Sequence, residues 1–207
     1  MTPLDERPAA TSAATHPDAA PDAGAPARPR GRLPGDPTPE QRLARIVRVD
    51  HAGEYGAKRI YEGQIAVMGK GRHGRTLRHM ADQELEHLRY FEKQLNARRV
   101  RPTALQPFWH VAGFLLGAGT AILGERAAMA CTVAVEEVID GHYEAQLKHL
   151  GPEEAELKSS ILKFQAEELE HRDIGLNNGA EQAPAYPVLS AAIKAGTKAA
   201  IWLAEKV

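Results

Sequence analysis

Glu84-Leu85-Glu86-His87 and Glu168-Leu169-Glu170-His171 are two copies of one four-residue motif. In each copy the first Glu and the His stand three residues apart, so on a helix both side chains lie on one face, one turn from each other. Each copy also has a Glu upstream: Glu54 lies 30 residues before the first copy, and Glu136 lies 32 residues before the second. The chain therefore reads as two helical hairpins, each supplying one Glu and then a Glu-x-x-His pair.

The residues that follow the two upstream Glu residues repeat as well. At offsets of +7, +8 and +10 both copies carry Tyr, Glu and Gln, namely Tyr61, Glu62 and Gln64, and Tyr143, Glu144 and Gln146. Both Glu-x-x-His pairs fall within apolar helical stripes, where a charged Glu is costly unless it is paired or bound to metal. A doubled pattern of this kind favours a buried site over solvated surface charge.

Four carboxylates and two imidazoles are the ligand set of a di-iron or di-manganese centre inside a four-helix bundle. Without metal, four carboxylates packed together would repel one another and take up protons. Two divalent cations balance their four negative charges, and neutral imidazoles suit iron or manganese. We therefore expect an all-α protein with a ferritin-like four-helix bundle, whose metal ligands are Glu54, Glu84, His87, Glu136, Glu168 and His171.

Composition excludes several other classes of protein. The chain has 26 Lys and Arg against 27 Asp and Glu, so no global field attracts nucleic acid. Its one cysteine, Cys131, rules out a four-Cys iron or zinc module within the chain. The sequence shows no sustained period-2 alternation of apolar and polar residues, so strands are not expected.

Composition and helix start and stop signals along the chain give the expected helices and their approximate boundaries. Residues 1–37 are rich in Pro, Ala, Asp and Arg, and we expect a disordered tail. Residues 38–207 then form one helical domain, which begins with a capping box between Thr38 and Gln41. The expected helices run to about residue 68, then over about 72–99, 125–150, 152–176 and 183–207, with one more helix in the uncharged stretch at 103–124.

The stretch at 103–124 contains no charged residue and allows three readings: a helix buried between protein layers, a helix that spans a membrane, or a helix that lies in the membrane interface. Arg98, Arg99 and Arg101 precede it as a basic anchor for the interfacial reading. Gly113 and Gly117 form a GxxxG pattern, a weak indication of close helix contact. The amphipathic, basic last helix either caps the bundle or makes a second membrane contact.

Several further residues are candidates for supporting the metal ligands. A ligating His usually donates its other N–H to a carboxylate or carbonyl. Asp50 and Asp140, one turn from the upstream Glu residues, either fill this role or are ordinary acids on the helix surface. Tyr61 and Tyr143 lie near the ligand faces and either donate to ligand carboxylates or are buried with their hydroxyls satisfied elsewhere. His142 lies off the ligand face and is not expected to bind metal.

Six blocks of the sequence resemble the demethoxyubiquinone hydroxylases of ubiquinone biosynthesis. They are DHAGEYGA at 50–57, DQELEH at 82–87, RVRPT at 99–103, LGAGTA at 116–121, CTVAVEE at 131–137 and EELEHRDIG at 167–175. The resemblance covers about residues 42–207, and the six expected ligands stand at the family's ligand positions. It implies two iron ions and O₂-dependent hydroxylation of the ring of a polyprenyl demethoxy-quinol.

The resemblance also implies cofactors and partners. The family is associated with NADH as a reductant, although the chain has no Gly-x-Gly-x-x-Gly dinucleotide fingerprint. A polyprenyl quinol stays in the bilayer, so we expect a peripheral protein on the cytoplasmic side of the cell membrane, bound through residues 103–124 and the last helix. A homo-oligomer or a complex of ubiquinone-biosynthesis proteins is a further expectation, and nucleic acid is not an expected partner.

Three other functions are alternatives to a hydroxylase. Two of them would use the same metal-ligand pattern, and the third would bind no metal. An iron-storage protein of ferritin type would need a large cage. A peroxide-reducing enzyme of rubrerythrin type would normally add a four-Cys site, and one of manganese-catalase type would bind manganese. A structural bundle without metal would tolerate alanine at Glu84 or His87.

Overall fold

The computed structural model describes residues 35–207, and within that range the protein is all-α, with no strand. The predicted disorder of residues 1–37 concerns mainly residues that lie outside the described range, and the domain boundary at residue 38 stays a prediction. Six α-helices and two short 3₁₀-helices follow in the order α1 (Pro39–Met68), α2 (Gly74–Arg98), α3 (Gln106–Ile122), α4 (Glu125–Leu147), η1 (Pro152–Glu154), α5 (Ala155–Asn177), η2 (Ala180–Gln182) and α6 (Tyr186–Ala204).

The predicted start of the first helix is confirmed. The Thr38 side chain accepts a hydrogen bond from the Gln41 backbone N–H, and the Gln41 side chain accepts one from the Thr38 backbone N–H. Other ends shift by a few residues: α2 begins at Gly74 rather than 72 because residues 69–73 form turns, and α4 ends at Leu147 rather than 150.

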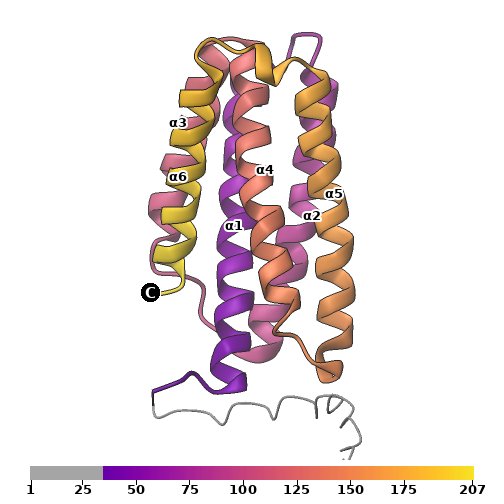
Figure 1. The fold of residues 1–207 in the computed structure, drawn as a ribbon, viewed down its shortest axis with the longest axis vertical. Helices are drawn as coiled ribbons and strands as arrows, with labels where there is room; N and C mark the ends of the chain where they lie inside the picture. Colours follow the sequence, from indigo (N-terminus) through magenta and orange to yellow (C-terminus); the bar gives the residue numbers. More distant parts are fainter. Residues whose placement is uncertain (1–34) are drawn as a thin grey trace, which may run out of the picture. The chain divides into compact units, whose positions relative to one another are not determined.

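Four helices build the centre of the domain as two hairpins. The α1–α2 hairpin and the α4–α5 hairpin pack together lengthwise (Figure 1). Two buried apolar clusters fill the space between them: Val47, Phe91 and Ile161 belong to one, and Tyr61 and Met80 belong to the other. Since Val47 and Tyr61 lie on opposite sides of Glu54 along α1, the clusters enclose the level at which the predicted ligands stand.

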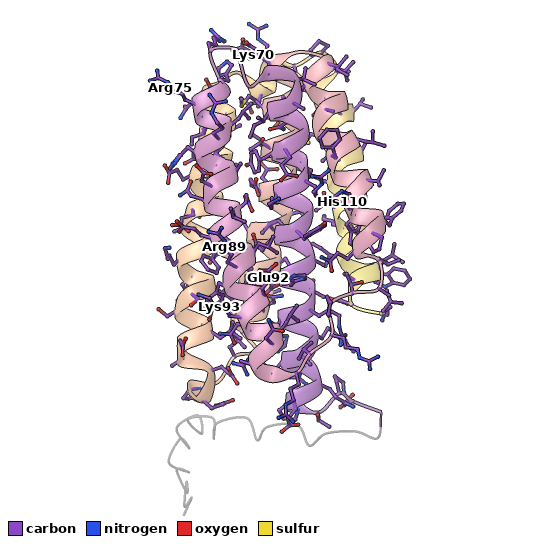
Figure 2. The ribbon with its side chains drawn as sticks, turned by 180° about the vertical axis from the view of Figure 1, so that it is seen from behind. Lys70, Arg75, Arg89, Glu92, Lys93 and His110 are labelled. Atoms are coloured by element: carbon purple, nitrogen blue, oxygen red, sulfur yellow. The ribbon has the colours of Figure 1, made fainter. Side chains whose placement is uncertain are left out.

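Charged side chains cover the outside of this bundle. Arg89, Glu92 and Lys93 of α2 are exposed, whereas Leu88 and Phe91 of the same helix are buried (Figure 2). This division follows the apolar stripe from which the helix was predicted. The stripe therefore turns His87 and Glu84 toward the interior.

The helix from the uncharged stretch, α3, packs closely on α1. A Cβ at Gly117 would overlap the Ile60 carbonyl oxygen, and a Cβ at Gly113 would come within 2.9 Å of the Gly56 carbonyl oxygen. The close helix contact indicated by the GxxxG pattern is thus confirmed. Near the N-terminus of α3, the Tyr55 hydroxyl and His110 Nδ1 are 2.7 Å apart and join α1 to α3.

The outer faces of α3 and α6 are apolar and exposed. On α3 the side chains of Phe108, Val111 and Leu115 are more than half exposed, and on α6 so are Val188 and Trp202. The reading of α3 as a helix buried between layers is therefore wrong. The spanning reading also fails, because no helix among residues 35–207 has the length and apolarity to cross a membrane. Arg98, one predicted anchor, instead forms an ion pair with Glu154.

Candidate metal centre

The structure brings the six predicted ligands together in the middle of the bundle. Each central helix contributes from its inward face, and every one of the six residues is buried, with at most 3% of the residue's surface exposed. The contributions are Glu54 from α1, Glu84 and His87 from α2, Glu136 from α4, and Glu168 and His171 from α5.

The six residues form two overlapping groups, each able to hold one metal ion. Glu54 and His87 belong to one group, Glu136 and His171 belong to the other, and Glu84 and Glu168 are common to both. Within each group the candidate ligand atoms all lie within 4.8 Å of one another. The arrangement therefore offers two neighbouring metal positions with two carboxylates between them.

Several polar atoms of this cluster are buried without any hydrogen-bond partner. They include both carboxylate oxygens of Glu84 and Oε2 of Glu136. A buried polar atom without a partner costs about 1–3 kcal/mol, and a charged one costs more. Because oxygen and imidazole nitrogen are ligands of divalent iron and manganese, bound cations would satisfy these atoms, and the donor set fits a metal.

Both histidines are turned so that Nδ1 faces the cluster and Nε2 faces outward. His87 Nδ1 lies 3.1 Å from Glu168 Oε1, and His171 Nδ1 lies 3.3 Å from Glu84 Oε1. On the outer side, His87 Nε2 donates to Glu167 Oε2 at 2.7 Å, and His171 Nε2 donates to Gln83 Oε1 at 3.0 Å. Such outer hydrogen bonds fix the tautomer and the ring orientation of a metal-binding histidine.

The sequence reasoning missed Gln83 and Glu167 and gave their role to Asp50 and Asp140, which is wrong. Asp50 Oδ1 accepts from Gln146 Nε2 at 2.6 Å, and Asp140 Oδ1 accepts from Gln165 Nε2 at 2.7 Å. Neither aspartate contacts a predicted ligating histidine. A signal for the true partners was present, since Gln83 and Glu167 each directly precede the first Glu of a Glu-x-x-His motif.

The two repeated tyrosines reach across the cluster to the opposite copy. The Tyr61 hydroxyl, on the helix of Glu54, donates to Glu136 Oε1 at 2.9 Å, and the Tyr143 hydroxyl, on the helix of Glu136, donates to Glu54 Oε1. Both tyrosines are buried, and burial together with the nearby carboxylates raises their pKa well above the usual value. They therefore stay protonated and hold the two carboxylates that the metal positions do not share.

Burial and crowding make the metal-free cluster retain protons. Burial raises the pKa of Glu84 and of Glu136 well above the usual range, and the charge of Glu168 adds to both shifts. Burial alone would lower the pKa of His87, but hydrogen bonds to carboxylates including Glu168 outweigh it and raise that pKa to about 12. For Glu168, burial is outweighed by hydrogen bonds from His171 and His87, and its pKa falls to about 2. A metal ion would have to displace protons from this cluster.

An apolar groove of about 330 Å³ lies where α3 and α6 cover α1 and α4. Its walls come from α3 and α6, and its floor comes from α1 and α4. On the floor, Gly53 and Val135 directly precede Glu54 and Glu136 in sequence, but none of the six predicted ligands lines the groove. Small residues keep it open: a Cβ at Gly56 would meet no atom within 4 Å.

Comparison with known proteins identifies the family of the chain. Residues 41–204 match the family model described as ubiquinone biosynthesis protein COQ7. The chain is 62% identical over 177 residues to a 3-demethoxyubiquinol 3-hydroxylase of Rhodospirillum rubrum, a match that covers 85% of this chain and 84% of that relative.

Relatives from eukaryotes match over most of their length too. The NADPH-dependent 3-demethoxyubiquinone 3-hydroxylase of Bos taurus mitochondria is 56% identical over 79% of this chain and 77% of its own. The mitochondrial 5-demethoxyubiquinone hydroxylase of Saccharomyces cerevisiae is 42% identical over 80% of this chain and 78% of its own. The family model and these relatives cover nearly all of the helical domain, and the chain belongs to the COQ7 family of ubiquinone biosynthesis proteins.

Proposed function

We propose that this protein is a demethoxyubiquinol hydroxylase of ubiquinone biosynthesis, a monooxygenase with a di-iron centre in a ferritin-like bundle. The observation that carries the proposal is the doubled, fully buried set of carboxylates and histidines in a chain of this family. Glu54, Glu84, His87, Glu136, Glu168 and His171 are the proposed iron ligands. When bound, the two irons supply the redox chemistry that activates O₂.

The side chains around the iron positions prepare the site for that chemistry. Glu84 and Glu168 would contribute to both metal positions, since both belong to the two ligand groups. The hydroxyls of Tyr61 and Tyr143 hold the two remaining carboxylates in place. Complete burial keeps bulk water from the reacting atoms, which protects an oxidising centre from side reactions.

The apolar groove is proposed to receive the quinol. Its lining is almost wholly apolar and suits a polyprenyl chain, and its floor is formed by α1 and α4, the helices that carry Glu54 and Glu136. The exposed apolar side chains of α3 and α6 form the outer walls, so a surface that enters the membrane interface would open the groove toward the bilayer. We accordingly propose a peripheral protein on the cytoplasmic side of the cell membrane.

A lipid substrate also separates this proposal from iron storage and peroxide removal. Neither of those activities needs an apolar groove for a lipid substrate. A reduced nicotinamide nucleotide is the proposed source of electrons, because several relatives carry NADPH dependence in their names. A homo-oligomer or a complex with other proteins of the pathway remains a proposal that rests on the family alone.

The test is incorporation of oxygen into the ring. Protein loaded with ferrous iron, a demethoxy-quinone, NADPH or NADH and ¹⁸O₂ should give a product that carries one ¹⁸O atom, as measured by mass spectrometry. Glu168→Ala should abolish the incorporation, whereas the exposed Glu170→Gln on the same helix should not. A protein that holds two irons, receives electrons and yet incorporates no ¹⁸O would contradict the proposal.

The groove has a test of its own. Gly56→Leu should fill it and lower kcat/KM for a long-chain quinol while leaving the iron content unchanged, because the added side chain points into the groove and not into the cluster. Gly141→Leu is the matched control, since Gly141 is exposed and also has open space around its Cβ position. Equal activity of the two variants would place the substrate elsewhere.

A further inference from the structure

The two metal positions differ in one outer contact. Each position is offered the shared Glu84 and Glu168, one carboxylate of its own held by a tyrosine, and one histidine Nδ1. The two positions differ in the residue that accepts the hydrogen bond from the outward-facing Nε2–H of the histidine. It is the Glu167 carboxylate for His87 and the neutral Gln83 amide for His171.

Gln83 and Glu167 stand at the same place in the two copies of the repeat, directly before the Glu-x-x-His motif. Each reaches across to the histidine of the other copy. The contact geometry is therefore repeated and the chemistry is not. If the two repeats were chemically equivalent here, both positions would carry the same residue, either Gln twice or Glu twice.

We propose that Glu167 and Gln83 are positioning residues that make the two metal positions unequal. The metal position that includes Glu54 and His87 binds a divalent cation more tightly than the one that includes Glu136 and His171. The tighter position therefore fills first. This inference rests on the metal centre proposed above and adds an order of assembly to it.

The physical cause is the charge of the acceptor. A hydrogen bond to a carboxylate is shorter and stronger than one to an amide, and it raises the basicity of the imidazole. The distances agree with that difference, at 2.7 Å for His87 to Glu167 against 3.0 Å for His171 to Gln83. A more basic imidazole is a better donor to a cation.

Burial preserves the effect of the Glu167 charge. Only 21% of the Glu167 side chain is exposed, so water and salt screen it less than they screen a surface acid. Its other oxygen, Oε1, lies 3.4 Å from Nζ of Lys163, whose side chain is 59% exposed. An ion pair so open to water contributes little and leaves the carboxylate available to His87.

Metal titration of the full-length, metal-free protein tests the order. Co²⁺, which does not change oxidation state under these conditions, would be titrated by calorimetry. Crystals grown with half an equivalent of Mn²⁺ would then show by anomalous scattering which position fills first. We expect two binding steps whose affinities differ at least about tenfold, the usual effect of such an outer partner, with the first ion beside His87.

Two reciprocal variants and one control isolate the cause. Glu167→Gln should weaken the tighter step by about ten- to hundredfold and merge the two steps. Gln83→Glu should instead strengthen the weaker step, which a merely structural role would not predict. Glu170→Gln removes one negative charge from the same helix without touching a histidine, and it should leave both steps unchanged.

The outcomes that overturn the inference are distinct from those that overturn the proposed function. Equal filling of the two positions, a first ion beside His171, or a failure of Gln83→Glu to strengthen the weaker step would each refute the unequal positions and leave the metal centre standing. Absence of any Co²⁺ binding would refute the metal centre itself. If Glu167→Gln does not fold, the Gln83→Glu arm still decides.

Discussion

Gly117 of α3 is the residue at which a single methyl group should loosen the wall of the groove. A Cβ at this position would overlap the carbonyl oxygen of Ile60 on α1 and lie 3.0 Å from its Cα. Both atoms belong to the backbone of a long helix and cannot rotate away as a side chain would. Gly117→Ala must therefore push α3 outward from α1.

The expected cost follows from two opposing effects. Overpacking of a close contact costs about 1–3 kcal/mol, toward the upper end when the clash is with backbone. Replacing a helical Gly by Ala returns about 1 kcal/mol through helix propensity. The net loss is roughly 1–2 kcal/mol of unfolding free energy, which for a domain of this size lowers Tm by about 2–8 °C.

Gly119→Ala is the matched control, two residues further along the same helix. A Cβ there would meet nothing within 4 Å, so only the propensity gain remains, and Tm should rise by about 2–4 °C. Thermal unfolding followed by far-UV circular dichroism measures both variants. Shifts of the same sign and size would refute the reasoning, because they would show that α3 does not pack closely on α1 at Gly117.

Three further predictions concern the cluster and the surface. Tyr61→Phe removes a hydrogen bond to the buried Glu136 carboxylate and should cost the metal-loaded protein about 1.5–3 kcal/mol in urea denaturation, whereas an unchanged midpoint would show that the contact is not formed. The metal-free cluster holds protons on groups such as Glu84 and His87, so its affinity for cations should rise with pH and fall on acidification. Calorimetry in buffers of different ionisation enthalpy should detect proton release when the cation binds. Binding without proton release would contradict the raised pKa values of these groups. Leu115→Glu, at a side chain 62% exposed on α3, should weaken binding to anionic lipid vesicles and keep the iron content; loss of iron with unchanged vesicle binding would mean that this face supports the bundle instead.

The sequence predicted the inward-facing residues of the bundle well because periodicity determines faces. A Glu and a His three residues apart on an apolar stripe leave one orientation that buries the stripe, and the repeat showed that four helices do this together. The structure gathers Glu54, His87 and His171 with their partners for that reason. The capping box at Thr38 was equally readable, since it depends on neighbouring residues alone.

Contacts between helices were harder to predict than faces. The position of Asp50 in the sequence suits a residue that supports a ligating histidine, but its partner Gln146 comes from α4, and Glu167 supports His87 from α5. Which residues oppose each other depends on the rotation and axial offset of packed helices, and periodicity fixes neither. Only the doubled position of Gln83 and Glu167 in the repeat carried that information.

The environment of the uncharged stretch at 103–124 could not be predicted, because composition does not distinguish a helix buried on one face from a helix buried on both. Its glycines Gly113 and Gly117 pack on α1, whereas Phe108 and Leu115 on the other side are exposed. Hydropathy averages these two faces into one apolar segment. Composition could not show either that Arg98 of the predicted basic anchor pairs with Glu154, a residue far away in sequence, whereas Arg99 and Arg101 are exposed.

Diffraction at the iron absorption edge from crystals of ferrous-loaded protein tests the central claim most directly. The account predicts two anomalous peaks per chain, about 3.5–4 Å apart as in other two-metal sites, with Glu84 and Glu168 between them. His87 Nδ1 should contact one iron and His171 Nδ1 the other. A single peak, or two peaks outside the cluster, would contradict a di-iron centre built from these six residues.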